Sequence, residues 1–160
     1  GKDALSNHLN FGVFYPLQTF SFNKKIDFTK TPILIEGNSQ KNIEKLKELC
    51  RILEVEFEEV DSKKRLHYHL AASFANNFTN HILSLTDELV NKFKLEKKFF
   101  IPIANETFKK FQSNKSKESQ TGPAVRNDVK TLKKHEEILK KSNYLNLYKI
   151  ITKSIKKNDL

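Results

Sequence analysis

Residues 66–86 read LHYHLAASFANNFTNHILSLT, and this stretch decides how the chain folds. It holds no Asp, Glu, Lys or Arg, although charged residues make up 30% of the chain. An uncharged run of this length suffices for a membrane span. Its three histidines and three asparagines argue against a span, because unpaired polar groups are costly in lipid. We therefore predict a long helix, capped by Asp61 or Ser62 and ending near Phe93, that is surrounded by protein.

The predicted long helix has two unlike faces when its residues are placed at steps of about 100°. Apolar residues from Phe74 to Leu89 fall on one face. A solvated opposite face should carry lysine in this chain, and this one carries none. Buried amides need partners, or each costs about 1–3 kcal/mol. We therefore expect the opposite face, the polar stripe, to line either a dimer interface or a ligand cleft. The polar stripe consists of His69, Ser73, Asn76, Asn77, Asn80 and Ser84.

The first 60 residues predict the edge of an α/β sheet. Phe11–Tyr15 and Thr31–Glu36 are apolar runs typical of strands, and Val55–Val60 alternates like a half-exposed strand. Ser39 is expected to cap a helix of about fifteen residues between the last two strands, which makes a parallel crossover unit. Two or three strands do not make a stable sheet alone, so we expect the rest of the sheet to be absent from this sequence.

The remainder of the chain predicts helices. Three follow the long helix, at about Lys97–Phe111, Val125–Lys141 and Asn143–Lys156, with a polar loop at Gln112–Thr121. The predicted fold class is therefore α+β and mostly α. Residues 1–60 would form the sheet edge, with two to three strands and one helix, and residues 61–160 an all-α domain of about four helices.

The segment Gln120–Asp128 reads QTGPAVRND and carries a turn signal around Gly122. Pro123 is expected to open the next helix at its first turn, where free backbone N–H groups suit an anion or a carbonyl oxygen. Arg126 stands close to Asp128. The two residues are either part of an anion site or a surface ion pair beside a capped helix.

The net charge of +10 raises the question of nucleic acid. Only three of the 29 basic residues are arginines, and the lysines are scattered in short clusters. Readers of phosphates and bases favour the bidentate guanidinium. A basic nucleic-acid-binding domain therefore ranks third among the functions, and we expect no nucleic-acid partner and no membrane.

Cysteine and histidine usage points to a reducing compartment and to no metal. The single cysteine, Cys50, lies in an apolar helical pattern and is interpreted as a small buried hydrophobe of a cytoplasmic protein. The first residues do not resemble a signal peptide. His67, His69 and His81 do not share one face and have no carboxylate among them, so no metal ligands are predicted.

Four motifs resemble one family. They are FYPLQTFS at 14–21, PILIEG at 32–37, RLHYHLAASFANNFTNHI at 65–82 and QTGPAVRNDVKT at 120–131. In this order they resemble Rossmann-type oxidoreductases with a C-terminal domain of unknown function 2520. That family is distantly similar to pyrroline-5-carboxylate reductase and to the 6-phosphogluconate dehydrogenase group. The resemblance covers Phe11–Lys156.

The resemblance implies a function for a longer protein. A Rossmann domain with a G-x-G-x-x-G turn would precede this sequence by roughly a hundred residues, and residues 1–60 would be its last part. The reaction would transfer hydride between NAD or NADP and a small carbonyl or imine substrate. The helical domain would carry the substrate side and form a homodimer, and this chain alone would be inert. The alternative is a dimerisation or interaction module without catalytic activity.

The resemblance also implies site residues. The family's His-Leu-Ala-Ala run falls on His69–Ala72, and hydroxyacid dehydrogenases of the wider group place a catalytic lysine where Ser73 stands. The candidate proton donor is therefore His69, one helical turn earlier. The predicted set is His69 as catalytic; Ser73, Asn77, Asn80, Gln120, Thr121, Gly122 and Arg126 as substrate-binding; and Gln18 and Thr19 as cofactor-binding.

Overall fold

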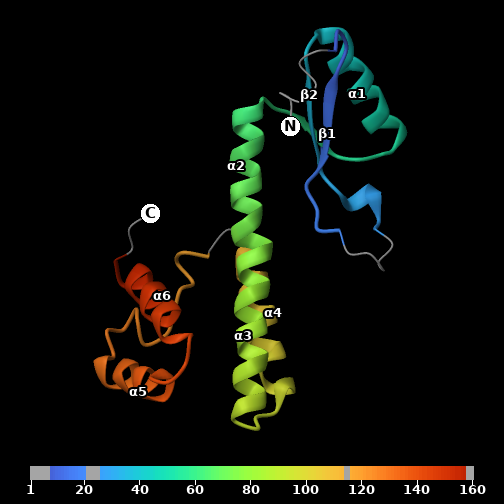
Figure 1. The fold of residues 1–160 in the computed structure, drawn as a ribbon. Helices are drawn as coiled ribbons and strands as arrows, with labels where there is room; N and C mark the ends of the chain where they lie inside the picture. The colour runs from blue at the N-terminus through green and yellow to red at the C-terminus, as the bar shows by residue number, and fades with distance from the viewer. Residues whose placement is uncertain (1–7, 21–25, 114–115, 158–160) are drawn as a thin grey trace. The chain divides into compact units, whose positions relative to one another are not determined.

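The computed structural model describes residues 8–20, 26–113 and 116–157. The chain divides into two compact units, residues 1–95 and 96–160. The first unit contains the sheet and the long helix, and the second contains the remaining helices (Figure 1). The boundary predicted after residue 60 separates the sheet from the long helix, and it stays a prediction.

The sheet of the first unit has three strands in the order β1-β2-β3. β1 (Gly12–Pro16) pairs antiparallel with β2 (Ile33–Gly37), and β2 pairs parallel with β3 (Phe57–Glu59). A short 3₁₀ turn, Phe28–Lys30, precedes β2 and is capped by the side chain of Asp27. All three predicted strands are present, and β2 and β3 form the predicted parallel crossover.

One face of the sheet holds the core of this unit. Helix α1 (Gln40–Ile52) begins at Ser39, whose side chain accepts from the backbone N–H of Asn42 at 3.3 Å. α1 covers this face (Figure 1), and Ile33, Ile35 and Cys50 are fully buried. Burial raises the pKa of the Cys50 thiol. The predicted cap and the interpretation of Cys50 as a buried hydrophobe are both confirmed.

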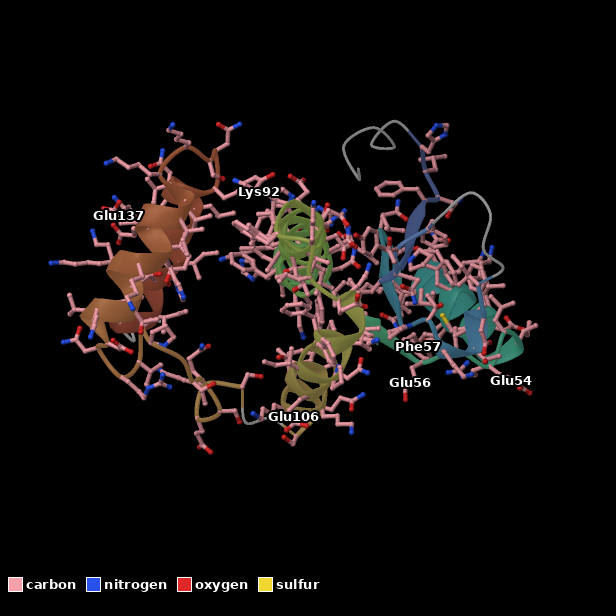
Figure 2. All side chains as sticks on the ribbon, turned by 90° about the horizontal axis from the view of Figure 1, so that it is seen from below. Glu54, Glu56, Phe57, Lys92, Glu106 and Glu137 are labelled. Atoms are coloured by element: carbon pink, nitrogen blue, oxygen red, sulfur yellow. The ribbon has the colours of Figure 1, made fainter. Side chains whose placement is uncertain are left out.

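The opposite face of the sheet carries polar residues. Strand side chains alternate between faces, and residues paired across strands share a face. Tyr15 pairs with Leu34, which pairs with Glu58, so these three form one row across the sheet on the face away from α1. β3 is an edge strand, and Glu56 and Phe57, which are labelled in Figure 2, are both exposed.

The long helix runs from Ser62 to Lys92 as predicted, with one interruption. Asp61 caps α2 (Ser62–Ala72) by accepting from the backbone N–H of Lys64 at 2.6 Å. A π-helical turn, Ser73–Phe78, connects α2 to α3 (Thr79–Lys92). A π turn contains one residue more than an α turn. Compared with an uninterrupted α-helix, the side chains of α3 are therefore rotated about the helix axis by about 100° relative to those of α2. The predicted polar stripe was laid out on a regular helix, so the positions of its residues beyond this turn are shifted from that layout, and the stripe as a whole stays a prediction.

The long helix carries large apolar side chains that are exposed among the described residues, with Leu66 at 64% and Phe74 at 62% of their surface accessible. We call this set the exposed apolar row; it consists of Leu66, Leu70, Phe74, Phe78 and Ile82.

The second unit contains three α-helices. After a 3₁₀ turn at Lys97–Phe99 come α4 (Ile101–Gln112), α5 (Val129–Leu139) and α6 (Leu145–Lys157). Pro102 lies in the first turn of α4. In the polar loop before α5, residues 114–115 lie outside the described residues. The predicted fold class, mostly α with a small sheet edge and four helices after it, is confirmed. No helix of the described ranges is long and apolar enough to span a membrane.

Candidate functional site

Helix α2 lies against the polar face of the sheet and contacts each strand through a side chain. The contact with β2 is an ion pair between the guanidinium of Arg65 and the carboxylate of Glu36, and both side chains are largely buried. The Ser62 hydroxyl donates to the Glu36 carboxylate at 3.0 Å. This cluster fixes the first turn of the helix to the end of the central strand.

The contact with β3 centres on Glu58. Its carboxylate accepts from the ammonium of Lys64 and from the hydroxyl of Tyr68. These bonds hold the pKa of Glu58 below its ordinary value and raise the pKa values of Lys64 and Tyr68. Two successive turns of α2 are thereby fixed to the sheet edge.

The contact with β1 involves the predicted proton donor. The Nδ1 atom of His69 lies 3.0 Å from the hydroxyl oxygen of Tyr15, within hydrogen-bond distance. The rings meet edge to face, with centroids 6.5 Å apart and planes at 81°. The His69 side chain is exposed. The imidazole is therefore held at one nitrogen by the sheet while the residue remains accessible.

The substrate-binding residues predicted beyond His69 begin at the π-helical turn. The hydroxyl of Ser73 donates to the backbone carbonyl of His69 at 3.0 Å. Asn77 lies within the turn and Asn80 in the first turn of α3, and both are exposed. Within the part of the chain that the structure describes, these two amides make no side-chain hydrogen bond. They retain donors and acceptors for a ligand or a partner.

The predicted cofactor residues follow the strand that carries Tyr15. Gln18 and Thr19 are exposed, and the side-chain amide oxygen Oε1 of Gln18 accepts from the Thr19 backbone N–H at 2.8 Å. They come three and four residues after Tyr15 in the chain. Their assignment to a cofactor stays a prediction.

The segment Gln120–Asp128 belongs to the second unit, and one prediction about it is wrong. Pro123 does not open a helix, because α5 begins at Val129. Asp128 is the cap: its carboxylate accepts from the backbone N–H and the hydroxyl of Thr131, at 3.0 and 2.7 Å. Asn127 before it has a positive φ of 51°, which no helix continues through. The predicted anion site beside Arg126 needed the free backbone N–H groups of a helix that starts at Pro123. Because α5 starts at Val129 instead, that site is not formed at Pro123.

The remaining residues of that segment form a turn. Gly122 has a φ of 107°, which favours glycine, and the Gln120 amide donates to the Thr121 carbonyl at 3.2 Å. The side chain of Arg126 is exposed. The hydrogen bonds of Thr131, and with them the charge of Arg126, keep the pKa of Asp128 below its ordinary value. The assignment of Gln120, Thr121, Gly122 and Arg126 to substrate binding stays a prediction.

Sequence reasoning missed Tyr15 as a member of the site. Its signal was present, because Tyr15 lies in the motif FYPLQTFS and alternates with Phe14, which packs against the core. A polar aromatic on the other face of a strand has to meet something other than that core. For metals, the described residues contain no group of three or more His, Cys, Asp or Glu side chains that could hold an ion.

Comparison with known proteins places this chain in a family. Residues 31–155 match the sequence profile described as domain of unknown function 2520 (DUF2520). The chain belongs to this family. The match covers β2, α1, β3 and the helices that follow, including His69 and Arg126.

Solved structures resemble this DUF2520 chain over nearly its whole length. A crystal structure named putative NADP oxidoreductase, from Bacteroides fragilis, is 35% identical with a TM-score of 0.89 over 97% of the chain. The chain spans 61% of that protein's length. A protein from Thermotoga maritima is 20% identical with a TM-score of 0.70, over 91% of this chain and 60% of its own, and shares the fold. No curated protein matches the chain significantly.

Proposed function

We propose that this DUF2520 chain is the substrate-side part of a cytoplasmic NAD(P)-dependent oxidoreductase. The observation that carries the proposal is the 35% identity and the TM-score of 0.89 to the Bacteroides fragilis protein named an NADP oxidoreductase. The reaction would transfer hydride between the nicotinamide and a small carbonyl or imine. The exposed imidazole of His69, held by Tyr15, supports a site for proton transfer in this chain.

The chain's own residues would bind the substrate and supply a proton. His69 would donate the proton to the carbonyl oxygen or imine nitrogen as it becomes basic, because an imidazole changes charge near neutral pH. Asn77, with Ser73 and Asn80, would orient the substrate by hydrogen bonds. Arg126 would bind a substrate carboxylate, since its planar guanidinium matches one bidentately. Gln120, Thr121 and Gly122 would complete that end of the site.

The residues of this chain do not fit the pyrophosphate of a dinucleotide. Backbone approach to a pyrophosphate needs a glycine-rich turn of the G-x-G-x-x-G type. The four glycines stand at positions 1, 12, 37 and 122, far from one another in the sequence. The proposal therefore assigns the pyrophosphate to the full-length protein outside these residues. Gln18 and Thr19 would contribute at most a peripheral contact.

The test is turnover by the full-length protein. NADH and NADPH oxidation is followed with a panel of small keto acids, aldehydes and cyclic imines. His69→Gln should reduce turnover by about 10²-fold or more with the fold intact. His67→Gln, on the same helix and also exposed, is the matched control and should retain activity. Arg126→Lys should chiefly raise KM. Unchanged turnover in both His69→Gln and Arg126→Lys would contradict the proposed site.

The second candidate function is dimerisation through the long helix without catalysis. The observation that favours it is the exposed apolar row, because large exposed apolar side chains in a cluster mark interaction sites. We propose a homodimer in either case, since a two-fold pairing covers such a surface with a second copy of itself. The two functions differ in whether the full-length protein turns over nicotinamide at all.

A further inference from the structure

The structure contains a histidine–tyrosine contact between two elements far apart in the sequence. The Nδ1 atom of His69 on α2 and the hydroxyl of Tyr15 on β1 lie 3.0 Å apart, and 54 residues separate them. We propose that Tyr15 is a positioning residue that holds His69 in the tautomer with hydrogen on Nε2. This inference rests on the proposed function, in which His69 is the proton donor. The neutral ring presents its Nε2–H to the substrate, and a second proton then enters at Nδ1 while the Tyr15 hydroxyl turns to accept from it. The resulting imidazolium gives its Nε2 proton to the substrate and returns to a neutral imidazole.

The chemistry of the two groups favours one direction for the bond. A neutral imidazole has one donor and one acceptor nitrogen, and a phenol hydroxyl can do both. An imidazole nitrogen is a much stronger base than a phenol oxygen, and the phenol is the stronger acid. Tyr15 therefore donates and Nδ1 of His69 accepts. The hydrogen on the imidazole then resides on Nε2, since the bond at one nitrogen sets the state of the other.

Tyr15 lies on a rigid part of the backbone, which suits it to hold the imidazole ring of His69 in place. It is paired with Leu34 of the central strand, and Leu34 is buried, with an exposed fraction of 2%. Pro16 follows, which restricts the backbone of Tyr15 to extended conformations. A site residue held by a group on a regular element keeps its geometry better than one held by a loop.

The bond is not needed to attach α2 to the sheet. The buried ion pair of Glu36 and the cluster around Glu58 already hold the first two turns of the helix. The bond of Tyr15 to His69 is an exposed one, and an exposed neutral hydrogen bond adds little stability. Its main effect is instead on the tautomer of the His69 imidazole.

The second unit offers a matched comparison. His135 on α5 and Tyr148 on α6 lie 2.9 Å apart, with rings edge to face and centroids 5.8 Å apart. This pair is partly buried, and burial raises the pKa of Tyr148. It joins two packed helices, and none of the predicted site residues belongs to it. Tyr148→Phe therefore removes the same kind of bond from a histidine outside the proposed site.

The experiment measures the histidine tautomers directly. Long-range ¹H–¹⁵N correlation spectra of the ¹⁵N-labelled chain are recorded at a pH where imidazole is neutral, with His69→Gln to assign the signal. His69 should show hydrogen on Nε2. Tyr15→Phe should shift it to the mixture typical of free imidazole, whereas Tyr148→Phe should change only His135. Hydrogen on Nδ1 in the unaltered chain, or the same tautomer in Tyr15→Phe, would overturn the inference.

Kinetics of the full-length protein provide the second readout. Tyr15→Phe should lower kcat about tenfold and leave KM within about twofold, because substrate contacts are kept. An unchanged kcat, with His69→Gln inactive, would overturn the positioning role alone. If His69→Gln is fully active, the proposed function fails, and the tautomer spectra still decide whether Tyr15 sets the state of His69.

Discussion

The guanidinium of Arg65 and the carboxylate of Glu36 form a largely buried ion pair that joins the start of α2 to the end of β2. The pair lies one helical turn before His69, on the same side of α2 that meets the sheet. The position of His69 over Tyr15 therefore depends on this ion pair. A loss of the pair should affect both stability and the site.

Arg65→Leu should destabilise the chain by about 3 kcal/mol, because it removes the cation from a buried carboxylate. Urea denaturation measures the change. The double variant Glu36→Leu, Arg65→Leu should recover most of the loss, since it removes both charges. Lys98→Leu is the control: it removes an exposed pair with Glu96 and should cost less than about 1 kcal/mol. A similar cost for Arg65→Leu would refute the prediction.

Phe74→Glu should convert a dimer into a monomer. At micromolar concentration the unaltered chain should sediment at about twice its mass, because in the proposed dimer a second copy covers the exposed apolar row. A charge placed there would be buried without a partner. Since Phe74 is 62% exposed in the single chain, folding should be nearly unaffected. Ile52→Glu, at a position on α1 that is 71% exposed, should remain dimeric. Monomeric behaviour of the unaltered chain would rule out this interface.

Deletion of Ala75 should convert the π-helical turn into regular α-helix. One residue fewer restores the i to i+4 bonding pattern, so circular dichroism should show undiminished helix and an unreduced melting temperature. The deletion also rotates α3 relative to α2 by about 100°. Dimerisation and turnover should therefore fall together. Retention of both would show that the π turn has no part in aligning the two halves of the long helix.

Helix starts were predictable from the sequence where the capping candidates stood together directly before a helical pattern. Ser39 and Asp61 each stand directly before a helical pattern, and both cap as expected. Pro123 and Asp128 are both start signals, five residues apart, and periodicity does not rank them. The bonds of Asp128 to Thr131 and the positive φ of Asn127 decide the start in the structure.

The π turn and the Tyr15 contact were beyond the sequence for different reasons. Residues 73–78 carry neither proline nor glycine, so no local propensity marks a change of helical period there. The contact of Tyr15 with His69 needs the antiparallel register of β1 on β2 and the phase of α2 over the sheet at once. Each depends on long-range packing. The resemblance of the surrounding motif singled out His69 from the sequence, and its role in proton transfer stays a prediction.

The capping of α5 by Asp128 should make stability depend on acid pH. The folded state lowers the pKa of this carboxyl below its ordinary value of 3.8, through bonds from Thr131 and the charge of Arg126. A group with a depressed pKa stabilises the fold above its unfolded value, and this contribution is lost as the pH falls through the folded value. Asp128→Asn keeps an oxygen that accepts from the Thr131 backbone N–H, but it does not titrate.

Melting temperatures of the chain and of Asp128→Asn should therefore converge as the pH falls from about 6 to about 2.5, because only the unaltered chain loses this carboxylate. Other carboxylates with lowered pKa values, such as Glu44 and Glu58, titrate in both proteins and cancel in the comparison. Asp128→Ala lacks the cap and should be less stable than Asp128→Asn at every pH. Parallel curves for the unaltered chain and Asp128→Asn would show that the ionised carboxylate contributes nothing beyond a neutral cap.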